Sequence, residues 1–402
     1  MRAPPAPPAW ASSLTSVGVT GTNGKTSTTG MVAALLGLLC RPVARVTTLG
    51  CFLEQELLDV PPHYDGFLET MRRCRDAGGR YAALELTSEA LALGFAKAWP
   101  CRVGVFTNLS LDHSDAHGSP EHYLASKAQL FLSLGPGCCA VLNGCDENAQ
   151  LVSEVVPEGA EVLHYGVASR GPAWAEELQL SASGIEPSLD GTRATLAPSA
   201  RFPELPRQLE LRASGAIFVE NALAALGAAL SLGVPAAAAC AALAALPPPP
   251  GRFQVLLRNP DVVVDYAHTP DALERTLVTA RALCRGTLTL VFGAGGDRDK
   301  LKRPLLGAAA AAADRIVLTS DNPRSERPEA IMDEIAAGIP ATCSVLREVD
   351  RKRAIERAIA AAGADDLVLI AGKGHERTQE LAGGRVPFSD VAIVRRYTKS
   401  AH

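Results

Sequence analysis

A glycine-rich loop between an expected strand and an expected helix constrains this 402-residue chain more than any other feature. The loop reads Gly-Thr-Asn-Gly-Lys-Thr, follows the apolar run 16–20 and precedes a helical pattern at 26–39. In this setting exposed backbone N–H groups and the helix N-terminus bind phosphate. The predicted phosphate site consists of Gly21, Thr22, Asn23, Gly24, Lys25 and Thr26.

Two side chains of this loop have predicted roles of their own. Lys25 is expected on the β- and γ-phosphates of a nucleotide, and the hydroxyl of Thr26 is expected to reach magnesium. The general P-loop pattern also has a glycine at the position held here by Val19, so the loop is a shorter and narrower form. An ordinary helix entry is the alternative. The strand before the loop and the helix after it favour a phosphate site.

The remaining pattern predicts two α/β domains. Apolar runs such as 81–86 and 103–108 alternate with helical patterns such as 120–134, which is typical of a parallel sheet covered by helices. The stretch 170–212 predicts a small β insertion, and the four prolines at 247–250 cannot continue a helix. We predict an α/β fold with a loose tail at 1–13, a central P-loop-type ATPase domain with a mostly parallel sheet at 14–246, a linker at 247–251 and a C-terminal Rossmann-like α/β domain at 252–402.

Charge and cysteine content exclude several classes of partner. A net charge of -4 gives no general electrostatic reason to bind nucleic acid or an anionic membrane. The apolar runs are too short for a membrane span, and the proline-rich start lacks the apolar region of a signal peptide. The 10 cysteines show no metal-binding spacing. We therefore expect reduced thiols, a cytoplasmic protein, and neither nucleic acid nor membrane as partner.

Four further motifs identify a family. Residues 106–110 read Phe-Thr-Asn-Leu-Ser, residues 321–324 read Asp-Asn-Pro-Arg, and 291–300 and 370–376 carry Gly-Gly-Asp-Arg-Asp-Lys and Gly-Lys-Gly-His-Glu. Together with the phosphate loop and in this order, they resemble the Mur ligases, and within that family the MurE-type branch that adds the third amino acid to UDP-N-acetylmuramoyl-dipeptide. The resemblance implies an ATP-dependent ligase that forms an amide bond through an acyl-phosphate. Folylpolyglutamate synthetases share the short loop but are disfavoured by the 321–324 motif.

The resemblance also implies a magnesium site. Glu85 ends an expected strand, where α/β sheets present ligands, although a solvated side chain is the alternative from sequence alone. Lys127 matches a lysine that the family carries as a carbamate, an anion able to bind a second magnesium. The implied cofactors are ATP and Mg²⁺. The implied metal ligands are Thr26, Glu85, His113 and carbamylated Lys127, and the implied catalytic residues are Lys25, Lys127, His113 and Arg298.

Nucleotide contacts are implied on both sides of the proline linker. An aromatic ring can stack on adenine, and a guanidinium can neutralise phosphate, so Tyr266 and Arg298 suit these roles. Core packing is the alternative for Tyr266. Ligands from two domains imply that the domains close over ATP. Besides the phosphate loop, the implied ATP-binding residues are Asn143, Asn221, Arg252, Asp265, Tyr266, His268 and Arg298.

The 321–324 motif resembles the form associated with diaminopimelate, a diamino acid with a carboxylate at each end. Arg324 would clamp the distal carboxylate as a bidentate pair, while Glu376 and Gly372 match positions that hold the distal ammonium and carboxylate. Lysine has no distal carboxylate, so an arginine here favours diaminopimelate. The implied amino-acid site consists of Asp321, Asn322, Arg324, Gly372 and Glu376.

The acceptor side departs from the family. MurE-type enzymes have an additional N-terminal domain that binds UDP, and here the phosphate-loop strand begins near residue 16, so we expect that domain to be absent. Residues 60–62 read Val-Pro-Pro where the family has Thr-Thr-Pro, and Glu89 replaces a histidine. We expect a carboxylate acceptor other than a full UDP-sugar peptide. Two alternatives remain. One is the peptidoglycan reaction itself, with the UDP-binding part supplied by another chain or dispensed with, and the other is a catalytically silent partner of another ligase.

Overall fold

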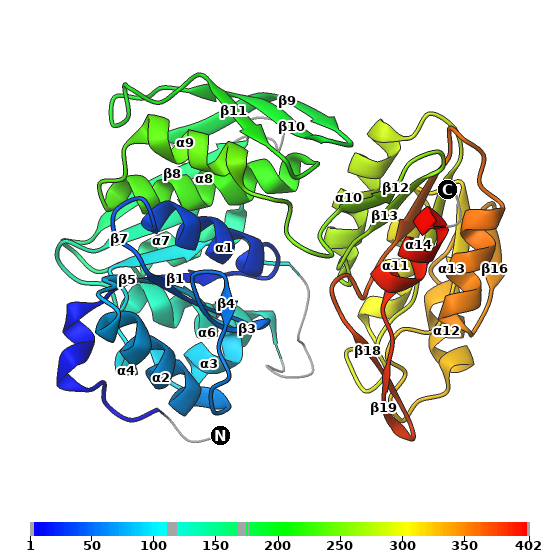
Figure 1. The fold of residues 1–402 in the computed structure, drawn as a ribbon, viewed down its shortest axis with the longest axis horizontal. Coiled ribbons are helices and arrows are strands. Elements are labelled where there is room, and N and C mark those ends of the chain that lie inside the picture. Colours follow the sequence, from blue (N-terminus) through cyan, green and yellow to red (C-terminus); the bar gives the residue numbers. More distant parts are fainter. Residues whose placement is uncertain (1–3, 111–118, 168–173, 176, 400–402) are drawn as a thin grey trace.

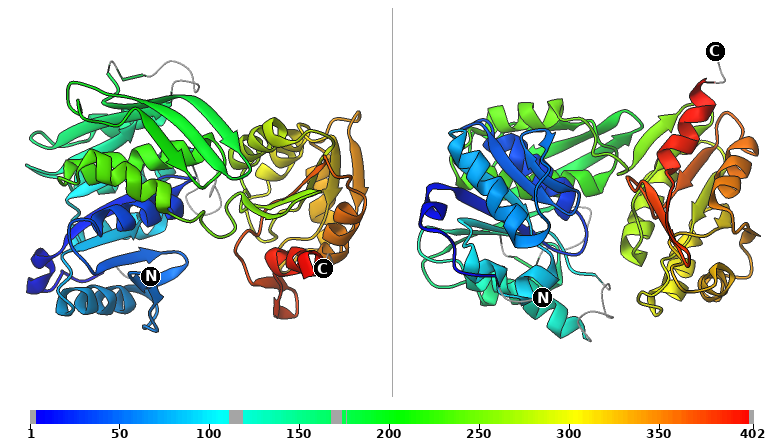
Figure 2. Two further views of the ribbon diagram at one scale, coloured as in Figure 1. Left: turned by 45° about the horizontal axis from the view of Figure 1, so that its top comes forward. Right: turned by 60° about the horizontal axis from the view of Figure 1, so that its bottom comes forward.

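The computed structural model describes residues 4–110, 119–167, 174–175 and 177–399. They form two α/β units, each built on its own sheet, which lie side by side in Figures 1 and 2. The first unit has a large, mostly parallel sheet that starts with the phosphate-loop strand. The second has a smaller, mostly parallel sheet. The predicted fold class is confirmed.

The phosphate-loop strand β1 lies in the interior of the first sheet, parallel to β5 on one side and β6 on the other. The segment predicted as a small β insertion forms β9, β10 and β11, and these strands extend the same sheet. The strand order is β11-β10-β9-β8-β7-β6-β1-β5-β2-β3-β4. The bounds are β1 Thr15–Thr20, β2 Val43–Thr47, β3 Gly50–Leu53, β4 Glu56–Leu57, β5 Tyr81–Glu85, β6 Val103–Phe106, β7 Cys139–Asn143, β8 Glu161–Val167, β9 Leu180–Ser188, β10 Gly191–Ala197 and β11 Gln208–Leu211.

Helices cover both faces of this sheet, as Figure 1 shows. On one face α1 packs against β1 and α8 packs against β6 to β9. Val32 and Leu35 of α1 belong to the same core cluster as Val17 and Val19 of β1. On the other face Met71 of α2 belongs to the second core cluster. Near-continuous apolar strands are what a sheet covered on both faces requires. The helices are α1 Lys25–Leu36, α2 His63–Asp76, α3 Ser88–Ala92, α4 Phe95–Ala98, α6 Pro120–Leu132, α7 Glu147–Glu154, α8 Ala216–Ser231 and α9 Ala236–Ala245.

The tail predicted to be loose is in part folded. Ala9–Ser13 form the 3₁₀ helix η1. The ring of Trp10 packs edge-on against Trp99 with 6.0 Å between the centroids, and the guanidinium of Arg75 lies over Trp10. Trp10 is half-buried, and the contacts of its ring hold the segment against the first unit. Such a contact leaves no periodic pattern in the sequence.

The second unit repeats the layered arrangement. Its sheet has the order β12-β13-β17-β14-β15-β16, and only β12 runs antiparallel to its neighbour. Helices α10, α11 and α12 pack on one face, and α13 and α14 on the other. The bounds are β12 Gln254–Leu257, β13 Asp261–Val264, β14 Leu288–Phe292, β15 Arg315–Leu318, β16 Ser344–Arg347, β17 Leu367–Ile370, α10 Pro270–Leu283, α11 Lys302–Ala310, α12 Pro328–Ala336, α13 Arg351–Ala360 and α14 Asp390–Lys399, with the hairpin β18 Thr378–Leu381 and β19 Gly384–Pro387.

The two units meet where α10 of the second faces α8 and the phosphate loop of the first. The Nδ2 of Asn23 donates a hydrogen bond to Oδ2 of Asp271 over 2.9 Å, and Arg275 pairs with Glu220. At the far end of the contact, Arg258 pairs with Asp190 over 2.7 Å. These polar contacts fix how the phosphate loop faces the second unit.

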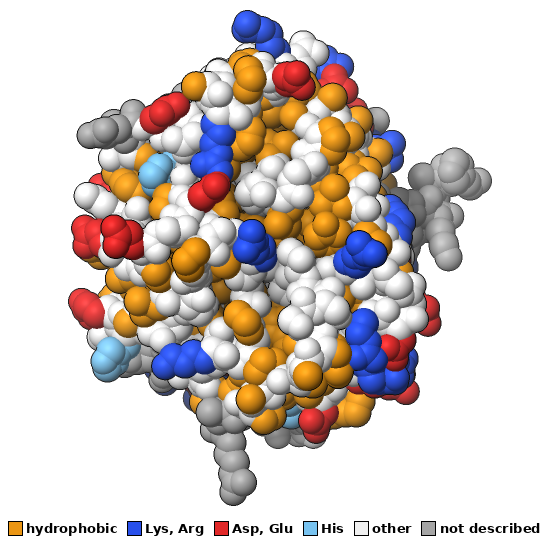
Figure 3. Space-filling view, turned by 90° about the vertical axis from the view of Figure 1, so that its left-hand side faces the viewer, with side chains coloured by type: hydrophobic (Ala, Val, Ile, Leu, Met, Phe, Trp, Pro, Cys, Tyr) orange, Lys and Arg blue, Asp and Glu red, His pale blue; other side chains and the backbone are white. Residues whose placement is uncertain are grey.

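The distribution of charged side chains on one face of the first unit is consistent with the small net charge of -4 (Figure 3). On the face of the first unit turned away from the second, basic, acidic and hydrophobic side chains are interspersed (Figure 3). In the part of the chain that the structure describes, no helix is long and apolar enough to cross a bilayer.

Candidate active site

A cavity of about 270 Å³ opens at the junction of the two units. The first unit contributes the phosphate loop, the end of β5 and the start of α8, and the second contributes the segments that surround β12 and β13. The cavity therefore needs both sides of the proline linker. The predicted site residues that line it are Thr22, Asn23, Gly24, Lys25, Thr26, Glu85, Lys127, Asn221, Arg252, Asp265, Tyr266 and His268.

The phosphate loop follows the carboxyl end of β1 and is braced by the segment after β6. The backbone N–H of Thr22 donates to the carbonyl of Asn108 over 2.8 Å, and that of Asn23 donates to Oδ1 of Asn108 over 2.9 Å. The hydroxyl of Thr107 donates to the carbonyl of Asn23 over 2.7 Å. The loop shape is thus held by its own unit.

Helix α1 begins at the cavity without a side-chain cap. Gly24 is its N-cap residue, with a φ of 85°, and as a glycine it supplies no side-chain cap. Uncapped N–H groups and the helix dipole favour an anion at this point. The ammonium of Lys25 bends back over the loop, donating to the carbonyl of Thr22 over 2.8 Å. The geometry fits the predicted phosphate site.

The close approach of α8 explains the glycine at position 24. A Cβ at Gly24 would overlap Oδ1 of Asn221. Gly94, the N-cap of α4, has the same φ of 85° but nothing within 4 Å of its would-be Cβ. Both alanine variants pay a left-handed backbone cost of about 1–2 kcal/mol, but only one displaces a neighbour.

We expect Gly24→Ala to weaken ATP binding by about tenfold or more, a loss of about 1.4 kcal/mol or more. Gly94→Ala should leave ATP affinity unchanged while lowering the free energy of unfolding by the backbone cost alone. Calorimetric titration with a non-hydrolysable ATP analogue measures the first effect, and denaturant unfolding measures the second. Equal ATP affinity in the two variants would contradict the placement of the nucleotide at this loop.

Oxygen ligands suited to magnesium lie at the end of β5. The hydroxyl of Thr26 donates to Oε2 of Glu85 over 2.9 Å, and the backbone N–H of Thr48 donates to the same oxygen over 3.2 Å. Mg²⁺ usually takes one or two protein oxygens together with substrate phosphates and waters, so this pair fits it. His113 lies outside the described residues. Among the residues that are described, no group of three or more His, Cys, Asp or Glu side chains could hold a metal.

Lys127 is buried, although a lysine is ordinarily solvated. Its side chain on α6 is 1% exposed, its Nζ donates to the carbonyl of Gly21 over 2.8 Å, and it lies 4.1 Å from the ring centroid of Tyr123. The terminal nitrogen is therefore placed beside the phosphate loop.

An aromatic group on the second unit faces the cavity. The guanidinium of Arg252 lies 4.2 Å from the ring centroid of Tyr266, and the rings of His268 and His375 lie 4.7 and 5.0 Å away. Burial raises the pKa of Tyr266 to about 12, and Glu376 adds to the shift, so the ring stays neutral. The Oδ2 of Asp265 accepts from the N–H of Phe253 over 2.6 Å. Asp265 thus braces the segment that carries Arg252.

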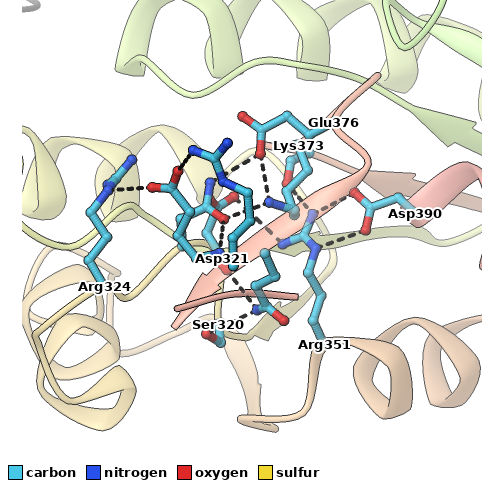
Figure 4. Close-up of polar contacts among 12 residues, drawn as sticks. Ser320, Asp321, Arg324, Arg351, Lys373, Glu376 and Asp390 are labelled. Carbon is cyan, nitrogen blue, oxygen red and sulfur yellow. Dashed lines mark hydrogen bonds and ion pairs between the residues drawn. The ribbon is translucent and has the colours of Figure 1, made fainter. Parts of the chain in front are cut away.

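A second polar group, in the second unit, contains the predicted amino-acid site (Figure 4). Lys373, fully buried, donates to Oδ1 of Asn322 over 2.8 Å and to Oε2 of Glu376 over 2.7 Å. A Cβ at Gly372 would lie 2.7 Å from Oδ2 of Asp321. The structure therefore brings Asp321, Asn322, Gly372 and Glu376 together.

Arg324 reaches this group from a strained position, with a φ of 52°. Its Nε donates to Oε2 of Glu380 over 2.8 Å, and its Nη1 donates to the carbonyl of Gly296 over 2.6 Å. A non-glycine residue in the left-handed region costs about 1–3 kcal/mol, and such strain is concentrated at functional sites. The two bonds hold the guanidinium in a fixed plane.

Comparison with known proteins assigns this arrangement to a family. The Mur ligase middle domain matches residues 19–229, and the Mur ligase glutamate ligase domain matches residues 251–374. This chain belongs to the Mur ligases. It is an ATP-dependent enzyme that forms carbon–nitrogen bonds, and Mur ligases use ATP and Mg²⁺.

The most similar relatives share one name. The UDP-N-acetylmuramoyl-L-alanyl-D-glutamate--2,6-diaminopimelate ligase of Thermosynechococcus vestitus is 40% identical over 397 residues, covering 96% of this chain and 77% of the relative. That of Pseudomonas aeruginosa is 39% identical over 387 residues, covering 94% of this chain and 76% of the relative. A solved structure of an enzyme with this name is 34% identical, with a TM-score of 0.67, and covers 97% of this chain and 79% of the other. The folylpolyglutamate synthase of Mycobacterium tuberculosis, 20% identical with a TM-score of 0.71, shares the fold.

Three of the predicted ATP-binding residues of this Mur ligase, Gly21, Asn143 and Arg298, are not part of the cavity lining. Asn143 is buried, and its amide donates to the carbonyl of Thr107 over 2.9 Å and accepts from the N–H of Cys145 over 3.0 Å. It therefore joins the ends of β6 and β7. Arg298 is exposed, between β14 and α11. Gly21 contributes the carbonyl that Lys127 binds.

Sequence reasoning missed other residues of the site. Thr48 holds the carboxylate of Glu85 through its N–H, which any residue except proline could supply, and through its hydroxyl. Asp271 bonds the phosphate-loop Asn23 from the other unit. Arg351 and Asp390 pair beneath Asp321. Only the helix-start pattern Thr-Pro-Asp at 269–271 marked one of these positions, because the others depend on contacts far apart in the chain.

Proposed function

We propose that this Mur ligase joins diaminopimelate to UDP-N-acetylmuramoyl-L-alanyl-D-glutamate, with ATP converted to ADP and phosphate. The expectation of an acceptor without the UDP-sugar is less well supported, because the relatives described above carry the name of the UDP-dependent reaction. The observation that carries the proposal is the group at Asp321–Glu376 next to the ATP cavity. The group combines the cation of Arg324 with the carboxylates of Asp321 and Glu376 (Figure 4). This set of charges complements an amino acid that carries an ammonium and a carboxylate at each end.

The proposed reaction has two steps, phosphoryl transfer at the ATP cavity and attack by the amine of the second substrate. The acceptor carboxylate attacks the γ-phosphorus of ATP in line, so that ADP leaves and an acyl-phosphate forms. The uncharged amine of the second substrate then attacks the acyl carbon, and the tetrahedral intermediate expels phosphate while the amine loses a proton. Lys25 and the N-terminus of α1 stabilise the charge on the phosphates during both steps.

Magnesium would be held by Thr26 and Glu85, together with His113, and would supply positive charge that offsets the charges of ATP and the acceptor. We further propose that Lys127 carries a carbamate. Its burial next to the carbonyl of Gly21 supports a role within the site rather than at the surface. Arg298, exposed on the loop after β14, is proposed to approach the phosphates when the units close further.

The same chemistry on a carboxylate without a UDP-sugar is a second candidate. Glu89 lines the ATP cavity where the family has a histidine, which adds a negative charge on the acceptor side. An acidic side chain disfavours a strongly anionic acceptor by charge repulsion.

One assay separates these candidates. The purified chain is given ATP, Mg²⁺, diaminopimelate and one of three acceptors, namely UDP-N-acetylmuramoyl-L-alanyl-D-glutamate, the same molecule without UDP, or free L-alanyl-D-glutamate. We expect ADP release and an amide product, seen by mass spectrometry, with the UDP-linked acceptor. Product only from an acceptor without UDP would overturn the proposal in favour of the second candidate. Failure to release ADP with any acceptor would instead support a catalytically silent partner.

Lysine in place of diaminopimelate tests the amine assignment. Lysine lacks the carboxylate that Arg324 is proposed to bind, so kcat/KM should fall by about a hundredfold, equivalent to about 2.7 kcal/mol. Arg324→Lys should reduce this preference because an ammonium cannot bind a carboxylate through two parallel N–H groups. Equal use of lysine and diaminopimelate by the unaltered protein would count against the assignment.

A further inference from the structure

A completely buried arginine lies beneath the predicted amino-acid site. Arg351 opens α13 and has no exposed side-chain surface. Its Nε donates to Oδ1 of Asp390 over 2.9 Å, and its Nη2 donates to Oδ2 of Asp390 over 2.8 Å and to the carbonyl of Ala371 over 2.9 Å. Figure 4 shows this two-point pairing at the base of the group. Asp390 is itself fully buried at the start of α14, so the guanidinium is held in one orientation.

The remaining nitrogen of Arg351 points towards the site. Among the described residues its Nη1 has no hydrogen-bond partner, although it is buried. The Oδ2 of Asp321 lies 4.0 Å from this Nη1. A buried donor that makes no hydrogen bond is costly, so its retention calls for an explanation.

Asp321 is fixed on its other sides. Its carbonyl accepts from Nε2 of Gln379 over 2.7 Å, and its side chain is 11% exposed. The absence of a side chain at Gly372 leaves room for Oδ2, since a Cβ there would lie 2.7 Å away. The carboxylate is therefore placed between Gly372 and Arg351, with a small opening towards the amino-acid site.

We propose that Arg351, locked by Asp390, is a positioning residue that orients the Asp321 carboxylate to receive an ammonium group of the incoming amino acid. This inference rests on the proposed function and extends it to a pair that does not touch substrate. The bidentate bond to Asp390 fixes the guanidinium, and Nη1 attracts one oxygen of Asp321. The other oxygen then faces the substrate.

The charges around Asp321 show why a buried cation is needed there. Burial raises the pKa of Asp321. Arg351 from α13 opposes that rise most strongly, and Lys373 from the segment after β17 opposes it less. Glu376, beside Lys373, and Asp390 from α14 add to the rise. An ammonium binds the ionised carboxylate, so substrate binding is retained above the pKa of Asp321 and lost as the pH falls through it. Removing the cation should move this loss to higher pH.

The test is a comparison of Arg351→Met, Arg351→Lys and Asp390→Asn in the full chain, with ATP and diaminopimelate varied in turn. For Arg351→Met we expect KM for diaminopimelate to rise by about tenfold or more, with KM for ATP within about twofold of the unaltered value. The acid limb of kcat/KM for diaminopimelate should move to higher pH. Arg351→Lys should keep the acid limb near its original pH because the charge remains. Asp390→Asn should raise KM for diaminopimelate. The acid limb of its kcat/KM should move less than that of Arg351→Met.

Arg303→Met is the matched control. Arg303 is also completely buried in the second unit and pairs with Glu326 and Glu334, away from Asp321. We expect this variant to lower the thermal stability without moving the acid limb for the amine. If Arg351→Met does not fold, Asp390→Asn carries the test. A rise in KM for diaminopimelate without a rise in KM for ATP supports the proposal, and an equal rise in both KM values contradicts it.

The outcomes separate two failures. If the unaltered protein neither binds nor uses diaminopimelate, the proposed function is wrong, and the inference about Arg351 falls with it. If the unaltered protein is active but Arg351→Met changes both KM values equally, with its acid limb unmoved, Arg351 has a structural role only. A limb that moves equally in Arg303→Met would also overturn the proposal.

Discussion

Lys25→Ala should abolish most of the ATP-dependent amide formation, lowering kcat by about a hundredfold to a thousandfold or more. Its ammonium lies over the phosphate loop at the uncapped N-terminus of α1, where the phosphates of ATP are proposed to bind. The charge that builds up on the transferring phosphoryl group is stabilised by such fixed cations, so the loss should appear mainly in kcat. Release of ADP and formation of the amide product measure it together.

A second lysine provides the control for this prediction. Lys97, exposed on α4, has no part in the proposed site, and Lys97→Ala should leave kcat unchanged. Thermal unfolding of both variants should resemble that of the unaltered protein, because neither side chain is part of a core. Retained amide formation in Lys25→Ala would mean that the phosphates do not bind at this loop.

Lys127→Ala should lower amide formation by about a hundredfold or more, for a different reason. If the buried nitrogen carries a carbamate, the site loses an anion that binds a hard cation. The unaltered protein should then lose activity in buffer depleted of bicarbonate and regain it when bicarbonate is added. A short carboxylate such as propionate should restore part of the activity of Lys127→Ala by standing in for the carbamate.

The bond from Lys127 to the carbonyl of Gly21 supplies the competing explanation. A lysine that acts only through this bond would still lose activity on replacement by alanine, since the phosphate loop would lose a brace. It would show no dependence on bicarbonate and no rescue by propionate. The combination of an inactive variant with a bicarbonate-independent parent would therefore rule out the carbamate.

Local patterns in the sequence were sufficient for the frame of the protein and for the phosphate loop. The loop can be recognised from neighbouring residues, because the turn, the glycine at position 24 and the start of α1 are contiguous. The contacts from Thr107 and Asn108 that brace it are distant in the chain and were not predicted. The parallel sheets follow from apolar strands alternating with helices. The folding of η1 onto Trp99 and the extension of the first sheet by β9–β11 were not predicted, since each depends on partners distant in the chain.

The site residues also fall into those that belong to short sequence motifs and those that only distant contacts bring to the site. Asp321, Asn322, Gly372 and Glu376 belong to two short motifs, and the fold brings these motifs together around Lys373. Asn143 has a motif but is used to join two strand ends, because its amide has both partners within the sheet. Arg351 and Asp390 lie 39 positions apart and have no motif, so only the folded chain reveals them.

The hydrogen bond between Asn23 and Asp271 has a thermodynamic consequence. It joins the loop that receives phosphate to the first turn of a helix in the other unit, so nucleotide and inter-unit geometry share one side chain. Linkage is reciprocal: whatever ATP does to the stability of that contact, the contact does equally to the affinity for ATP. The affinity for ATP, measured by titration, therefore also reports on the stability of the contact between the two units. This holds for variants of α10 that do not touch the phosphates.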